Sequence, residues 1–116
     1  MNINKWLDDF KACWVKKDIL ALLELFSEDL EYWETPYKCL SSKNKIVEER
    51  QAIISQQNIE LSMSIFSSLE NNHTVLWSLS YTTEHIGLQE WAGTYLIMLD
   101  PENKCYYFYQ TGEKRS

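Results

Sequence analysis

The chain has 116 residues, with eleven basic and seventeen acidic side chains and a formal net charge of −6. This length predicts one domain spanning residues 1–116, and the acidic balance excludes the basic face that nucleic-acid phosphates or acidic membranes require. Five Trp and seven Tyr residues indicate either a thick core or a ring-lined cavity.

The first half of the chain predicts two helices before any strand. Apolar residues recur at helical spacing from Ile3 to Trp14, so the spacing predicts a first helix there. Asp18 is a typical capping residue for a second helix, whose apolar stripe runs from Ile19 to Phe26.

A short strand and a third helix follow. Leu30–Trp33 favours extended chain because Tyr and Trp have high strand propensity, and Pro36 ends the strand by removing a donor. We expect residues 37–42 to form a loop, followed by a helix over residues 43–56. Arg50 lies within the apolar stripe of that helix.

From Ile59 onward the apolar period changes to two, which is typical of strands. Turn signals at Asn71-Asn72, at Gly87 and after Asp100 separate four predicted strands, at residues 59–65, 75–82, 91–99 and 105–110. The predicted fold class is therefore α+β. We expect a cone-shaped, curved antiparallel sheet of one short and four long strands packed on three N-terminal helices.

Cysteine use and the N-terminus predict the location of the protein. Cys13, Cys39 and Cys105 are an odd, widely spaced set without a CxxC pair, so we expect reduced thiols, no metal site and no cofactor. No apolar signal-peptide core follows Met1, and no apolar run approaches the ~20 residues of a membrane span. We therefore expect a cytoplasmic protein.

Two segments resemble a known family. Residues 14–37, WVKKDILALLELFSEDLEYWETPY, combine a helix end, a capping Asp, a short helix, an acidic pair, a strand and a Pro-aromatic pair. Residues 91–109, WAGTYLIMLDPENKCYYFY, combine a long strand, an Asp-containing turn and an aromatic strand. This order resembles the nuclear transport factor 2-like superfamily, in its SnoaL-like and ketosteroid isomerase-like branch.

The resemblance does not carry over steroid isomerase chemistry. The position of the family's base Asp falls at Thr35, with Glu34 one residue earlier. The position of the family's Tyr donor falls at Phe10, and that of its protonated Asp donor falls at Tyr95. Only Tyr95 keeps a hydroxyl group, so steroid isomerase activity is not expected.

Glu34 has two readings. In a regular strand, Trp33 and Thr35 share one face and Glu34 faces the other, so an inward Thr35 predicts a solvated Glu34. A bulge beside Pro36 would reverse this and bury the carboxylate among rings, where its pKa would rise and it could act as a base. Tyr95 or Tyr109 would then be the hydroxyl donor. The sequence favours the solvated reading.

The rings either line a ligand cavity or fill the cone completely. The predicted catalytic residues are Glu34 and Tyr95, and the predicted lining residues are Trp14, Trp33, Thr35, Trp77, Trp91 and Tyr109. A cavity predicts a protein that binds a small apolar ligand and leaves a cofactor-free isomerase, cyclase or hydrolase open.

A filled cone predicts a non-catalytic interaction module instead. Such a module would form a homodimer through the outer face of the sheet. We expect that face to carry the small polar and apolar side chains of Leu76, Ser78, Ser80, Thr82, Ala92, Thr94, Leu96 and Met98.

Overall fold

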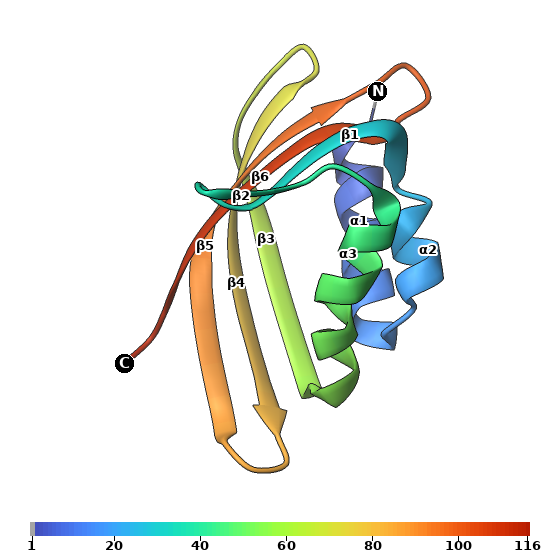
Figure 1. Cartoon of the computed structure of the whole chain (residues 1–116). Coiled ribbons are helices and arrows are strands. Elements are labelled where there is room, and N and C mark those ends of the chain that lie inside the picture. Colours follow the sequence, from blue (N-terminus) through green and yellow to red (C-terminus); the bar gives the residue numbers. More distant parts are fainter. Residues whose placement is uncertain (1) are drawn as a thin grey trace.

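A computed structural model describes residues 2–116 as a layer of helices packed on one curved sheet (Figure 1). The helices are α1 (Ile3–Lys16), α2 (Ile19–Leu23) and α3 (Lys43–Arg50), and the 3₁₀ helix η1 (Gln51–Ser55) extends α3. The strands are β1 (Phe26–Thr35), β2 (Lys38–Leu40), β3 (Gln57–Leu69), β4 (Asn72–Thr83), β5 (Gly87–Leu99) and β6 (Cys105–Lys114). The predicted α+β class is confirmed.

The six strands form a single open sheet in the order β2-β1-β6-β5-β4-β3. Strands β3 to β6 are consecutive antiparallel neighbours, as the alternating pattern predicted. Strand β1 joins the far side of β6 in parallel. Figure 1 shows all the helices on one side of the sheet, which curves around them. The interior between the helices and the sheet is therefore walled on two sides.

Three predicted boundaries are corrected by the structure. Phe26 does not end the second helix but begins β1, because the Cys105 N–H donates to the Leu25 carbonyl at 2.8 Å and Phe26 then pairs with Cys105. Residues 38–40 are the short strand β2, which pairs with the end of β1, and not a loop. The third helix continues past Arg50 only as 3₁₀ turns. The sheet thus has six strands where five were expected.

Side-chain caps fix where each helix begins. The Asn2 side chain accepts a hydrogen bond from the Lys5 N–H at 3.0 Å. The predicted Asp18 cap is present, and its carboxylate accepts from the Ala21 N–H at 3.0 Å. A cap of this kind stabilises a helix by about 1 kcal/mol. The Asp18 cap also starts a new helix direction directly after α1.

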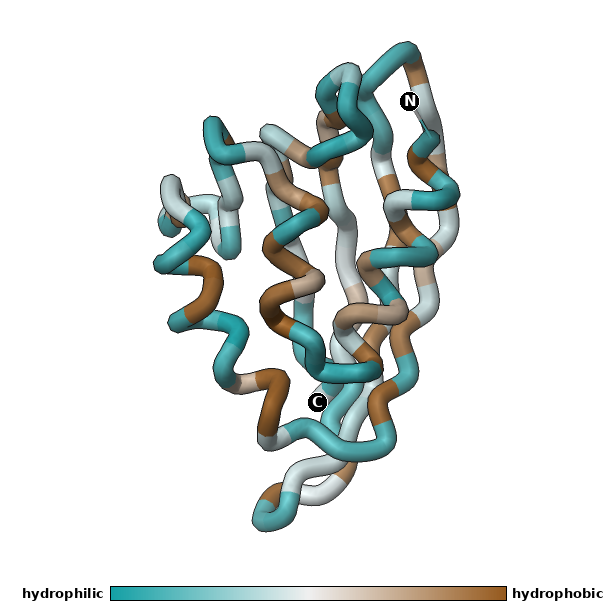
Figure 2. Tube along the Cα trace, turned by 90° about the vertical axis from the view of Figure 1, so that its right-hand side faces the viewer, coloured by the Kyte–Doolittle hydropathy of each residue, from teal (hydrophilic) through white to brown (hydrophobic). Residues whose placement is uncertain are grey.

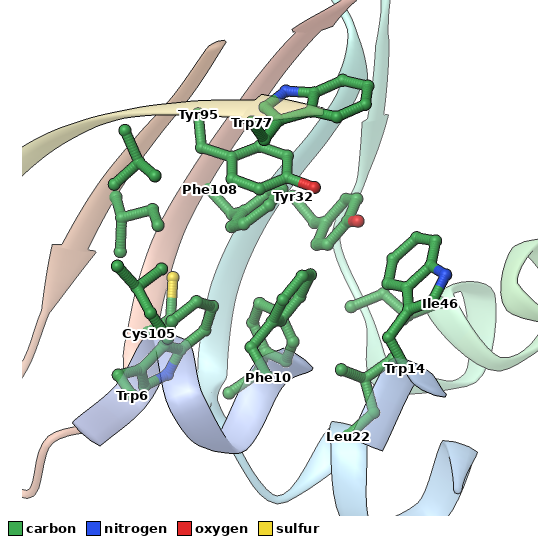
Figure 3. Close-up of a cluster of buried hydrophobic side chains, with 14 of the residues drawn as sticks. Trp6, Phe10, Trp14, Leu22, Tyr32, Ile46, Trp77, Tyr95, Cys105 and Phe108 are labelled. Atoms are coloured by element: carbon green, nitrogen blue, oxygen red, sulfur yellow. The ribbon is translucent and has the colours of Figure 1, made fainter. Parts of the chain in front are cut away.

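An aromatic cluster joins the helices to the sheet (Figure 3). Phe10 of α1 lies at its centre, with ring centroids 5.1 Å from Trp6, 5.6 Å from Trp14 and 5.9 Å from both Tyr95 and Phe108. Figure 2 shows the helices crossing in front of the sheet, with hydrophobic and hydrophilic stretches alternating along each. The rings therefore fill the interior of the cone beside α1. This agrees, for that part of the interior, with the predicted alternative in which the rings pack together.

Candidate functional site

A cavity of about 580 Å³ lies beyond the aromatic cluster, bounded by the sheet, the end of α1 and the α3–η1 segment. This volume is within the usual range for a small-molecule site. The lining residues are Trp14, Glu34, Thr35, Pro36, Glu49, Arg50, Ala52, Gln56, Trp77, Leu79, Tyr81, Trp91, Tyr95, Gln110, Thr111 and Gly112. The interior of the cone thus holds both a packed cluster and a cavity.

Most predicted site residues line this cavity, but two do not. Trp33 and Tyr109 contact each other, with ring centroids 6.3 Å apart, outside the set of lining residues. Their neighbours explain this, because Tyr32 is buried and the strand period turns Trp33 to the opposite face. Glu34 shares the inward parity of Tyr32, and a register shift between Trp33 and Thr35 brings Thr35 to the cavity as well.

Gly112 of β6 allows one cavity wall to form. A Cβ atom at this position would come within 2.6 Å of Cζ2 of Trp77, which is shorter than any relaxed contact. Without a side chain there, the Trp77 indole lies against β6 and stacks on Tyr95 with ring centroids 5.3 Å apart (Figure 3). The wall is therefore flat and aromatic.

Glu34 and Glu49 form an acidic pair in the cavity wall. The Glu34 Oε2 atom is buried and has no hydrogen-bond partner within residues 2–116. Burial raises the pKa of Glu34, the charge of Glu49 raises it further, and Lys38 opposes the shift. Lys38 itself forms an ion pair with Glu49. Glu34 therefore holds its proton at a higher pH than an ordinary glutamate and can exchange it with a ligand.

Arg50 is a second charged group in the wall, and the sequence-based prediction did not include it. Its side chain is 8% exposed, and Cζ lies 5.0 Å from the ring centroids of both Trp14 and Tyr32. Burial lowers the pKa of Arg50 to about 10, while the nearby Tyr95 acts in the opposite direction. The guanidinium is thus cationic at neutral pH. The sequence signal was a charged residue inside an apolar helical stripe.

Tyr95 contributes a hydroxyl group that stays protonated. The residue is 2% exposed, and burial raises its pKa above the usual value. Its hydroxyl can donate a hydrogen bond to a ligand but does not act as a base near neutral pH. Gln56, which the sequence did not single out, accepts from the Trp14 indole N–H at 3.3 Å and holds that ring at the cavity.

A second hollow, of about 800 Å³, lies beside the last residues of the chain. Its walls include charged side chains such as Glu60, Glu113 and Lys114, and Arg115 pairs there with Glu90 at 2.9 Å. Of the predicted site residues, only Trp91 reaches it. The cavity beside Arg50 is therefore the candidate site.

The described residues offer no other recognised centre. Within residues 2–116, no group of three or more His, Cys, Asp or Glu side chains is arranged to hold a metal ion. In the same part of the chain, no helix is long and apolar enough to cross a membrane. The three cysteines are free thiols, and burial raises the pKa of Cys105, which keeps that thiol protonated.

Comparison with solved structures identifies the fold. No family model and no curated protein matches the sequence. An NTF2-like protein of unknown function from Exiguobacterium sp. 255-15 superposes with a TM-score of 0.77 at 15% identity, covering 93% of this chain and 98% of that one. A candidate polyketide cyclase from Pseudomonas putida KT2440 gives 0.76 at 11% identity, with coverages of 96% and 91%.

A third structure is a protein with a ketosteroid isomerase-like fold from Catenulispora acidiphila DSM 44928, in complex with trimethylamine. It gives a TM-score of 0.76 at 11% identity and covers 91% of this chain and 83% of that one. The chain therefore has the NTF2-like cone fold, and the predicted resemblance is confirmed at the level of the fold.

Proposed function

We propose that this protein binds a small molecule in the cavity and transfers a proton to or from it without a cofactor. The observation that carries this proposal is the half-buried Glu34 side chain, which lines an aromatic cavity and has a buried Oε2 atom without a hydrogen-bond partner among the described residues. Folds alone do not settle activity. The cyclase and isomerase-like names of similar structures support a small-molecule role.

The cavity residues have complementary roles in this proposal. Trp77 and Trp91 supply flat apolar walls on which a planar ligand packs. Glu34 takes or gives the proton, because its raised pKa brings proton exchange closer to neutral pH. Tyr95 donates a hydrogen bond to an oxygen of the ligand, which stabilises negative charge that develops there.

Proton transfer can be tested before the natural substrate is known. Bicyclic ketones such as 2-tetralone are incubated with the protein in D₂O, and incorporation of deuterium next to the carbonyl is followed by mass spectrometry. The wild type should accelerate exchange and Glu34→Gln should not, while Glu48→Gln, an exposed change on α3, should behave as the wild type. Binding of the ketones without accelerated exchange would refute Glu34 as a proton-transfer group and leave a binding protein.

A non-catalytic homodimer is the second candidate, and one observation favours it. Leu76 and Leu96 on the outer face of the sheet are 45% and 40% exposed. The partly exposed rings of Trp33 and Tyr109 lie on the same face. Association through this face would bury these apolar groups. Light scattering at micromolar concentration should show a dimer that Leu96→Asp dissociates, and a monomeric wild type would exclude this candidate.

A further inference from the structure

Arg50 is a buried cation without a counterion. Of the ion pairs that involve residues 2–116, none includes Arg50. Its Nε and Nη2 atoms are buried without a hydrogen-bond acceptor in the same part of the chain. Glu49 precedes it in α3, but successive helix residues point about 100° apart, and Glu49 is directed to Lys38. Buried charges are normally paired, so a partner for Arg50 is missing.

A second hydrogen-bond donor without an acceptor lies close to Arg50. The Tyr32 hydroxyl is buried and has no partner within the described residues. Figure 3 shows the hydroxyl groups of Tyr32 and Tyr95 pointing to the side of the cluster where Trp14 lies. The Arg50 guanidinium contacts the rings of both Trp14 and Tyr32. Arg50 and Tyr95, which line the cavity on this side, therefore offer hydrogen-bond donors to an acceptor in it.

A carboxylate matches these donors better than a larger anion does. The planar guanidinium can donate two parallel hydrogen bonds to the two oxygens of a carboxylate. Arg50 is one cation, and the acidic pair of Glu34 and Glu49 lines the same cavity, which disfavours a doubly charged phosphate group. The flat walls of Trp77 and Trp91 fit an aromatic body attached to the carboxylate.

We propose that Arg50 binds the carboxylate of the ligand, so that the cavity selects a planar aromatic or polycyclic carboxylic acid. The proposal rests on the proposed function, because it names the class of ligand for the same cavity. Arg50 then neutralises and orients one end of the ligand, while Glu34 faces another part of it.

Matched probes test the charge preference directly. Isothermal titration calorimetry at neutral pH compares 2-naphthoate with 2-naphthamide, which has nearly the same shape but no charge. The wild type should bind the carboxylate at least about tenfold more tightly, since hydrogen bonds between charged groups are the strong ones. Arg50→Met should lose this preference but keep naphthamide binding. Arg115→Met is the control, because it removes the exposed arginine and should leave the preference unchanged.

A measurement on the wild type removes any dependence on the folding of a variant. The chain contains two arginines, Arg50 and Arg115, so the Nε–H NMR spectrum has two assignable signals. Addition of 2-naphthoate should shift the Arg50 signal and not that of Arg115. An unmoved Arg50 signal at saturation, or equal affinities for the two probes, would overturn the carboxylate site while leaving a binding cavity. Failure of both probes to bind would overturn this proposal together with the small-molecule function.

Discussion

Replacing Arg50 by Met should increase the stability of the folded protein. Burial lowers the pKa of Arg50 well below its usual value, to about 10. One unit of pKa corresponds to about 1.4 kcal/mol, so keeping the guanidinium charged costs the folded state about 3 kcal/mol. The contacts with the Trp14 and Tyr32 rings offset part of this cost, by about 0.5–2 kcal/mol each. Together the two ring contacts are worth about 1–4 kcal/mol, but the sulfur of a methionine at this position keeps about 0.3–1.5 kcal/mol of contact with each ring. The net gain expected from Arg50→Met is therefore about 2 kcal/mol.

The pH dependence has a definite sign. The folded-state pKa lies below the unfolded-state value, so the unfolded chain binds the proton more strongly. The cost is therefore fully present at neutral pH, below both values. It disappears only as the pH rises from about 10 toward the higher pKa of arginine in the unfolded chain. A measurement at neutral pH thus sees the whole effect.

Urea unfolding followed by tryptophan fluorescence measures the change. Arg50→Met should raise the urea midpoint at an unchanged slope. Arg115→Met should change stability by less than about 0.5 kcal/mol, because Arg115 is exposed. If Arg50→Met instead lowered the free energy of unfolding, Arg50 would have a stabilising partner inside the protein. The reasoning from an unpaired cation would then be refuted.

Three further substitutions test the site and the core. Glu34→Gln should stabilise the protein at neutral pH but not near pH 4. The pKa of Glu34 is raised above its ordinary value of 4.5, so the charged carboxylate costs the folded state free energy at neutral pH. This cost is absent once the carboxyl group is protonated in both the folded and the unfolded chain, near pH 4. Thermal unfolding at both pH values, with Glu48→Gln as the control, measures this difference. Gly112→Ala should cost about 1–3 kcal/mol and shift the tryptophan emission, because its Cβ would displace Trp77; unchanged stability and emission would exclude that clash. Phe10→Ala should cost about 3–5 kcal/mol in urea unfolding, since four rings surround Phe10.

The second half of the fold could be predicted because each strand follows one rule. Alternating apolar residues buried one face of β4 and β5, as with Val75, Trp77 and Leu79 of β4, whereas in the edge strand β3 the same alternation buried only Leu61. Short turns then joined neighbouring strands, so chain order also gave spatial order. Local periodicity and turn residues were sufficient to define this meander.

The first half depended on contacts that the local pattern does not contain. Phe26 continues the apolar spacing of α2, yet β6 lies eighty residues further along the chain and recruits this segment through the Cys105 N–H bond to Leu25. Strand β2 has three residues and exists through its pairing with Tyr32 and Trp33. Long-range pairing overrides weak local preference in both places.

Side-chain direction in β1 was the main error at the site. The family position suggested an inward Thr35, and regular alternation then placed Trp33 inside and Glu34 outside. Tyr32 shows the opposite parity, because it is 1% exposed and packs on Phe108 with ring centroids 4.6 Å apart. One irregularity before Pro36 allows Glu34 and Thr35 both to reach the cavity. Alternation cannot be counted through such a shift.

The positions of Arg50 and Glu34 indicate that the cavity serves to bind a ligand, because neither side chain improves the packing of the protein. Both side chains line the same cavity, and for both of them burial opposes the charged form. Uncharged side chains at these two positions would make a more stable protein, as the predicted gains for Arg50→Met and Glu34→Gln state. Charged groups that lower the folding stability and lie at one shared cavity are typical of functional sites, because binding and catalysis need them there. The same two substitutions should therefore stabilise the fold and abolish, respectively, carboxylate selection and proton exchange.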